Sequence, residues 1–285
     1  MTRLLQKVAS ASFVLYVAAF SSPPVPHAQD LPRFPPQEDL NYEVQVFWIT
    51  RAAQGHLRIE RRGEDHYRAE LIAETKGVVR WLTGSRKNHY ISEMAYDPQK
   101  RRFISRQYTK LIFKGKNAER TTAAIDEEKS VVDWEFFSNG KLIAEGADPI
   151  PDKVRYEDLL SAFFNFRTGQ LVPLEPGREM TVFTLPDYRA IAKEKMGRDD
   201  KERFQKFEIR IADEETETAY RKKFGRTKEK GMLVLVKVPK NLFGQETGEI
   251  RVWFNTNLVP VAATVEDAYY FGDVHGILIK PDTRP

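Results

Sequence analysis

Hydrophobic and polar residues alternate with a period of two along most of the chain from Asn41 onward, in short runs rich in aromatic and β-branched residues. Such alternation is typical of β-strands that bury one face. Turn residues separate the runs, and the clearest turn is Asn139-Gly140, because a tight hairpin turn needs positive φ angles. The pattern predicts a mainly β fold of one or more curved antiparallel sheets, arranged as a sandwich or half-barrel.

One segment departs from this alternation. Its apolar residues recur at helical spacing: Tyr156, Leu159, Leu160, Phe163 and Phe164. These positions share one face of a helix. Asp152 is placed to cap the start, and Gly169 lies just beyond the end. We therefore predict one amphipathic helix over about residues 153–166, with its aromatic face packed on the sheet.

The N-terminal residues are typical of a secretory signal, since Arg3 and Lys7 precede an apolar run from Val8 to Phe20. The run has 13 residues, fewer than the roughly 20 that span a bilayer. We expect an exported, periplasmic or extracellular protein, with a retained N-terminal anchor as the alternative. The predicted segments are a signal peptide over 1–28, a Pro-rich linker over 29–40, and one β-rich domain over 41–280 that contains a polar excursion at about 187–205, either a short helix or irregular.

The composition gives little support to catalysis. The chain has no cysteine, which excludes disulfides, thiolate metal sites and a lipid-modified cysteine. The histidines lack the spacing of metal ligands, and there is no Gly-x-Ser-x-Gly elbow or phosphate-binding glycine loop. The sequence therefore predicts no metal, no cofactor and no catalytic residues.

Charge is distributed unevenly, although the formal net charge is only +4 and does not indicate a nucleic-acid partner. Between Lys76 and Arg120 there are twelve basic and three acidic residues, whereas residues 126–158 hold ten acidic and four basic ones. The even positions of the strand predicted over 102–114 include Arg102, Arg106, Tyr108, Lys110 and Lys114. This strand either offers a basic surface to an anionic partner, such as lipid head groups or an acidic polysaccharide, or pairs with the acidic segment across neighbouring strands.

Three short motifs are Tyr96-Asp97-Pro98, the stretch from Asp158 through Ser161, Phe163 and Phe164 to Arg167, and Trp253 with Pro260-Val261. Together they resemble a bacterial envelope family catalogued as domain of unknown function 3108, over about residues 41–279, and the second motif is the most specific. In the third motif the family usually has Asp in the turn, where this chain has Asn257. The resemblance implies a β-rich, signal-bearing envelope protein and supplies no known reaction.

We interpret these motif residues as structural. Residues Trp253 to Glu266, WFNTNLVPVAATVE, are predicted to form a turn between two strands, because Asn255 to Asn257 favour turns and Pro260 cannot donate within a ladder. Asp158 and Arg167 fall on different faces of a continuous helix, so each is predicted to tie the helix to neighbouring strands.

The leading hypothesis is non-enzymatic binding of a lipid-like or other hydrophobic envelope molecule in a groove between sheet and helix. Its expected contacts are Arg102, Arg106, Tyr108, Lys110, Phe163 and Phe164. One alternative is an assembly module that offers a sheet edge to an envelope protein. Another is a glycan hydrolase, which would require acids such as Glu64, Asp65 or Asp158 around a cleft with a raised pKa.

Overall fold

The computed structural model describes residues 37–152, 154–169, 171, 173–194, 204–224, 229–238, 248–266 and 272–279. They all belong to one compact unit, Phe34–Pro285. The expected signal peptide, linker residues 29–36 and residues 195–203 of the polar excursion lie outside the described residues.

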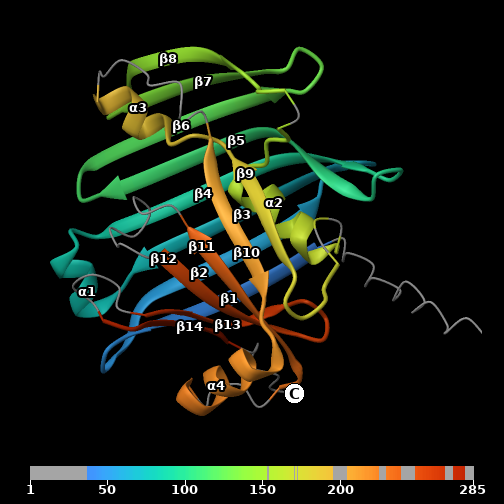
Figure 1. Ribbon diagram of the computed structural model, residues 1–285. Helices are drawn as coiled ribbons and strands as arrows, with labels where there is room; N and C mark the ends of the chain where they lie inside the picture. Colours follow the sequence, from blue (N-terminus) through green and yellow to red (C-terminus); the bar gives the residue numbers. More distant parts are fainter. Residues whose placement is uncertain are drawn as a thin grey trace, which may run out of the picture. The chain divides into compact units, whose positions relative to one another are not determined.

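The described strands form one 14-stranded antiparallel sheet (Figure 1). Its first eight strands are β1 (Gln37–Val46), β2 (Ile49–Arg61), β3 (His66–Thr75), β4 (Arg86–Asp97), β5 (Arg102–Lys114), β6 (Asn117–Asp126), β7 (Val131–Ser138) and β8 (Lys141–Pro149). The others are β9 (Glu179–Thr184), β10 (Gln205–Ile211), β11 (Gly231–Val238), β12 (Gly248–Asn255), β13 (Pro260–Val265) and β14 (Val274–Ile279). The prediction of a mainly β, antiparallel fold is confirmed.

The order of the strands shows how the two halves of the chain combine. Strands β1 to β8 neighbour one another in sequence order, and β14 to β9 continue in reverse order from the other side of β1. The two ends of the order, β8 and β9, do not pair within the described part of the chain, so the sheet is not closed into a barrel. The two halves therefore form one sheet, joined where the first and last strands pair.

The predicted turns are present. Asn139 and Gly140 have φ angles of 49° and 80° and join β7 to β8. The turn between β12 and β13 is held by Asn255, whose side-chain oxygen accepts from the backbone N–H groups of Asn257 and Val259, each at 3.0 Å. Pro260 is the first residue of β13, as its missing N–H requires.

The prediction of a single helix is wrong, because four short helices are described: α1 (Gly77–Leu82), α2 (Leu159–Arg167), α3 (Tyr188–Glu194) and α4 (Glu214–Phe224). Helices α1 and α3 are 6 and 7 residues long, too short for a 3.6-residue period to show. Helix α4 is polar and carries acids in its first turn and bases in its last, which suits the helix dipole but gives no apolar stripe.

Two predicted boundaries are also wrong. Helix α2 begins at Leu159 rather than near 153, because Asp158, not Asp152, caps it and closes a capping box with Ser161. Just before the cap, Glu157 pairs with Thr184 as an isolated bridge. Strand β1 begins inside the predicted linker, at Gln37, since its first residues already pair with β2.

Helix α2 lies between two parts of the same sheet. On one side Leu160 and Phe164 pack with residues of β2 to β5, which include Ile59, Met94 and Phe103. On the other side Phe166, with Phe163 against it, packs with residues of β10 to β12: Ile211, Val234 and Phe254. Figure 1 shows β9 and β10 passing across β3 and β4 near α2. The helix therefore packs on β2 to β5 with one side and on β10 to β12 with the other.

Candidate functional site

A β-bulge in β5 decides which basic side chains face the interior. Gln107 pairs with Glu93 and Ser105 with Met94, so Arg106 has no partner on β4. An extra residue reverses the alternation of the strand. Before the bulge, Phe103 and Ser105 face α2, and after it Tyr108 and Lys110 face the same side. The predicted basic stripe of even positions is therefore wrong.

The basic residues of this strand have separate environments. Arg102 is 8% exposed and lies 3.4 Å from Glu127 and 3.8 Å from Glu157. This is the pairing with the acidic segment that the alternative interpretation expected. Arg106 is exposed at the bulge, and Lys110 is partly buried. Of the three basic residues predicted to contact a ligand, only Lys110 lines the same pocket as Tyr108.

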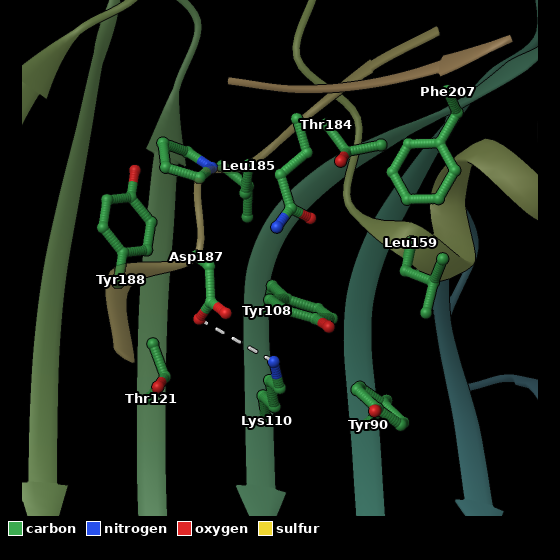
Figure 2. A pocket seen from close by; sticks show the side chains of 12 residues that line it. Tyr90, Tyr108, Lys110, Thr121, Leu159, Thr184, Leu185, Asp187, Tyr188 and Phe207 are labelled. Atoms are coloured by element: carbon green, nitrogen blue, oxygen red, sulfur yellow. Dashed lines mark ion pairs between the residues drawn. The ribbon is translucent and has the colours of Figure 1, made fainter. Parts of the chain in front are cut away.

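That pocket, here called the polar pocket, lies on β4 to β6. Tyr90, Lys110 and Thr121 are direct neighbours across these three strands, and all three line the pocket with Tyr108. The segment from Thr184 to Tyr188 lines it as well, and the volume is about 70 Å³. Figure 2 shows Lys110 pointing from β5 toward Asp187, and the Nζ to Oδ1 distance is 3.9 Å.

The polar groups of this pocket are poorly satisfied. The Lys110–Asp187 separation is longer than a hydrogen bond. Within the described chain, the Tyr108 hydroxyl has no hydrogen-bond partner. Burial raises its pKa well above the usual range, so the hydroxyl stays protonated. Burial lowers the pKa of Lys110, against the opposing charge of Asp187. The pocket thus offers an ammonium and a phenol that are free to donate to a bound group.

A second space, here called the apolar groove, lies between α2 and strands β9 to β12. It has a volume of about 190 Å³. It is lined almost entirely by apolar side chains, among them Ala162, Phe163, Phe166, Val182, Ile209, Val236 and Phe254. Leu159, Thr184 and Phe207 line both the apolar groove and the polar pocket. The two spaces therefore adjoin.

The two predicted phenylalanines of α2 have different roles. Phe163 lines the apolar groove. Phe164 is 0% exposed and belongs to the core on β2 to β5. Because neighbouring helical residues point about 100° apart, only Phe163 is available to a molecule in the groove.

Two buried carboxylates, Glu157 and Asp158, hold α2 in place. Asp158 accepts from Ser92 of β4, from Ser105 of β5 and from two backbone N–H groups of α2. Glu157 lies 2.9 Å from Arg155 Nε and accepts from Asn165 at 3.1 Å. These contacts are structural, and neither carboxylate lines the polar pocket or the apolar groove.

Asn165 completes this cluster in a way that the sequence did not indicate. Its side-chain oxygen accepts from the Phe103 N–H at 2.7 Å, and its nitrogen donates to the Phe103 carbonyl at 2.8 Å. The Asn165 side chain therefore makes the two hydrogen bonds that a neighbouring strand would make with the backbone of Phe103. Ser92 and Ser105 were missed as well, because only the long-range packing of α2 brings them to Asp158. Glu157 was missed because its burial cannot be read from the sequence.

Of the three acids named for the glycan hydrolase alternative, Asp158 lies apart from the other two. Glu64 and Asp65 are exposed in the turn between β2 and β3, whereas Asp158 is 0% exposed beneath α2. Glu64, Asp65 and Asp158 therefore do not line a common cleft.

The remaining motif residues lie at α4 and around the turn from β12 to β13. Trp253 is 0% exposed, stacks on Tyr220 of α4 and lies 4.1 Å below the Arg221 guanidinium. The carbonyl of Pro260 accepts from the Tyr42 hydroxyl at 2.9 Å. Asn257 is exposed in the turn. None of the three lines the polar pocket or the apolar groove.

Glu157 should make the stability of the protein depend on pH. Burial raises its pKa to about 7, with the charge of Arg155 opposing this. Its stabilising contribution is complete below the unfolded pKa and is lost as pH rises through about 7. Between pH 5 and 8 the parent should lose stability as Glu157 ionises, whereas the glutamine of Glu157→Gln does not titrate. The difference in unfolding free energy between the variant and the parent should therefore shift in favour of the variant by on the order of 3 kcal/mol. Urea denaturation across this range measures the difference, and a constant difference would contradict the assignment.

Comparisons with known proteins give a family and a similar solved structure. The family described as "Protein of unknown function (DUF3108)" matches residues 41–275. No curated protein matches the chain. A solved structure titled "Crystal Structure of Beta-barrel-like Protein of Domain of Unknown Function DUF1849 from Brucella abortus" is similar at 12% sequence identity with a TM-score of 0.45, over 88% of this chain and 100% of that one.

Proposed function

This chain belongs to the DUF3108 family of proteins of unknown function, and we propose that it binds, without catalysis, an amphiphilic molecule with an apolar tail and an anionic head group. The tail would lie in the apolar groove against Phe163. The head group would lie in the polar pocket against Lys110 and Tyr108. We further propose that the protein is exported and binds an envelope lipid or a molecule of similar chemistry.

The observation that carries this proposal is the contact between the two spaces through Leu159, Thr184 and Phe207. A dry apolar cavity of about 150 Å³ accommodates benzene, so a groove of about 190 Å³ has room for part of an acyl chain. The polar pocket, about 70 Å³, has room for several waters or a small anionic group. An amphiphile is the class of molecule that satisfies both spaces at once.

The Lys110 ammonium favours an anion over a neutral head group, whereas the Asp187 carboxylate, which lines the same pocket, opposes it. Lys110 has only a loose ion pair with Asp187, and a buried ammonium that is incompletely paired is costly. A carboxylate or phosphate between Lys110 and the Tyr108 hydroxyl would accept hydrogen bonds from both. Hydrogen bonds to charged groups contribute about 1.5–3 kcal/mol each, enough to select the anionic form of a ligand.

Decanoate and 1-decanol test this function directly, because they share a chain and differ in the charge of the head group. We expect isothermal titration calorimetry to show tighter binding of decanoate. Lys110→Met should weaken decanoate binding by about tenfold or more and leave 1-decanol binding nearly unchanged. Ala162→Phe, which fills the apolar groove, should weaken the binding of both.

Arg106→Met is the matched control, because Arg106 lies on the same strand but is exposed at the bulge. It should not change the affinity for either molecule. Native mass spectrometry of the chain purified without detergent, followed by solvent extraction, would identify a ligand that copurifies. The absence of decanoate and 1-decanol binding by the folded parent protein would reject the proposal, as would equal effects of the Lys110 and Arg106 variants.

A further inference from the structure

An exposed apolar cluster lies at one end of the sheet and shares no residue with the polar pocket or the apolar groove. Trp48 and Trp81 are 85% and 80% exposed. Phe47, Val78 and Leu82 are each more than half exposed. Isolated exposed hydrophobic residues are ordinary, but a group that contains two nearly uncovered tryptophans marks an interaction surface.

Two segments bring this cluster together. Phe47 and Trp48 form the turn between β1 and β2, with their rings 5.5 Å apart. Helix α1 packs beside this turn, because the Lys76 N–H donates to the Ala52 carbonyl at 2.8 Å and Val79 packs on Val46 and Ala52. Figure 1 shows α1 and the β1–β2 turn on the same, left-hand side of the view.

The sequence of α1 is unusual for a helix with only one covered side. Val79 faces the sheet and is buried. Val78, Trp81 and Leu82 point away and are at least 62% exposed. Apart from Arg80, the side chains on the outer side of α1 are apolar. Because apolar helix faces are normally covered, this side is suited to contact with another apolar surface.

Basic residues surround the cluster. The β1–β2, β3–β4, β5–β6 and β7–β8 connections all emerge at this end of the antiparallel meander. Residues 47–51, 76–87, 114–117 and 139–141 contain eight basic and no acidic residues: Arg51, Lys76, Arg80, Arg86, Lys87, Lys114, Lys116 and Lys141. At the opposite end, residues 61–66, 97–102 and 126–131 contain six basic and six acidic residues. The charge is therefore specific to the end that carries the tryptophans.

Most of this charge is not neutralised by neighbours. Arg51 pairs with Glu43 and Lys76 with Glu74, each at 3.0 Å. The other six basic residues have no ion-pair partner within 4.0 Å among the residues that the structure describes. Asp273 is also close, since its backbone carbonyl accepts from the Phe47 N–H. The six unpaired basic residues therefore outnumber the acidic residues described beside them.

We propose that this end of the sheet docks on the surface of an anionic lipid bilayer. Trp48 and Trp81 would enter the head-group layer, where tryptophan is enriched, and the lysines and arginines would lie against lipid phosphates. The proposed contact is with the bilayer surface, and none of the described helices is long and apolar enough to cross a membrane. A symmetric contact between two copies would instead place like charges opposite each other, which is unfavourable.

Vesicle flotation tests the proposal. Vesicles of phosphatidylcholine with about 30% phosphatidylglycerol should carry the protein with them, and vesicles of phosphatidylcholine alone should carry much less. Two of the four tryptophans, Trp134 and Trp253, are buried, so a blue shift of the fluorescence would report entry of Trp48 and Trp81 into the bilayer. Added salt should weaken binding, because it screens exposed charges.

Variants separate the two parts of the surface. The double variant Lys114→Gln with Lys116→Gln should weaken binding to anionic vesicles by on the order of 30-fold, because the loss of each lysine should weaken it by roughly fivefold. Trp48→Ala with Trp81→Ala should abolish the blue shift and weaken binding further. The matched control is Lys100→Gln with Lys129→Gln at the opposite end, where both side chains are exposed, and this variant should bind like the parent.

Three results would overturn the proposal, with every variant first shown to unfold at the temperature of the parent. One is failure of the parent to float with anionic vesicles at low salt. Another is equal binding by the lysine variant and its control. The third is a dimer in sedimentation experiments that becomes a monomer in the tryptophan variant, which would assign the cluster to a second copy of the chain.

Discussion

Replacement of Phe164 by alanine is expected to lower the free energy of unfolding by about 3–5 kcal/mol, the range found for large aromatic residues removed from a packed core. Phe164 is 0% exposed, with its ring centroid 6.3 Å from that of Phe103 and 5.1 Å from that of Phe163. Its removal leaves a cavity between α2 and β2 to β5 that the rigid sheet cannot close. Urea denaturation followed by tryptophan fluorescence measures the loss.

Phe163→Ala is the natural comparison, since the two residues are adjacent and chemically identical. Phe163 is partly buried and lines the apolar groove, so its removal exposes less core and enlarges the groove. We expect a clearly smaller loss of stability and a larger change in decanoate affinity than for Phe164→Ala. Equal losses of stability, with no change in affinity, would place both residues in the core and remove Phe163 from the proposed site.

The strands and their turns could be predicted because their signals are local. The alternation of apolar and polar residues depends only on the burial of one face, and a turn such as Asn139-Gly140 needs φ angles that few residues adopt. The same reasoning located the turn at Asn255 and the first residue of β13 at Pro260. Local backbone preferences fixed these features.

The candidate site could not be predicted because it depends on two long-range events. The bulge at Arg106 decides that Lys110 rather than Arg106 points inward, and no residue type in the strand signals a bulge. The apolar groove exists because β9 to β12 fold over α2, and periodicity gives no information about which strands face each other. The aromatic face of the helix could be seen in the sequence, but its partners could not.

The start of α2 illustrates a competition between two plausible caps. Asp152 and Asp158 both precede apolar residues at helical spacing, and Tyr156 fits the helical pattern. In the fold Tyr156 is instead buried beside Trp134 and Tyr188. Asp158 is selected because its second carboxylate oxygen also accepts from two serines of the sheet. A cap that is satisfied by the sheet as well outweighs one that is satisfied by the helix alone.

Arg167→Ala should also cost about 3–5 kcal/mol of unfolding free energy, because it breaks a buried ion pair from one side. The Arg167 side chain is 4% exposed and forms a two-fold contact with the carboxylate of Glu38, which is 13% exposed. Its Nε donates to the Leu258 carbonyl at 2.7 Å. One side chain therefore connects the end of α2 to β1 and to the turn before β13, and its loss leaves a buried carboxylate and a backbone carbonyl without their donors.

A double-mutant cycle shows how this cost arises. If the uncompensated charge of Glu38 is the main term, Arg167→Ala combined with Glu38→Ala should be more stable than Arg167→Ala alone. Arg178→Ala removes an exposed arginine that pairs with Glu175 at 3.1 Å, and it should cost no more than about 1 kcal/mol. If Arg167→Ala also lowered the free energy of unfolding by no more than about 1 kcal/mol, the ion pair with Glu38 would not be the contact that holds α2 against both halves of the sheet. The larger loss would assign the Arg167–Glu38 ion pair to folding and leave binding to the apolar groove beside α2.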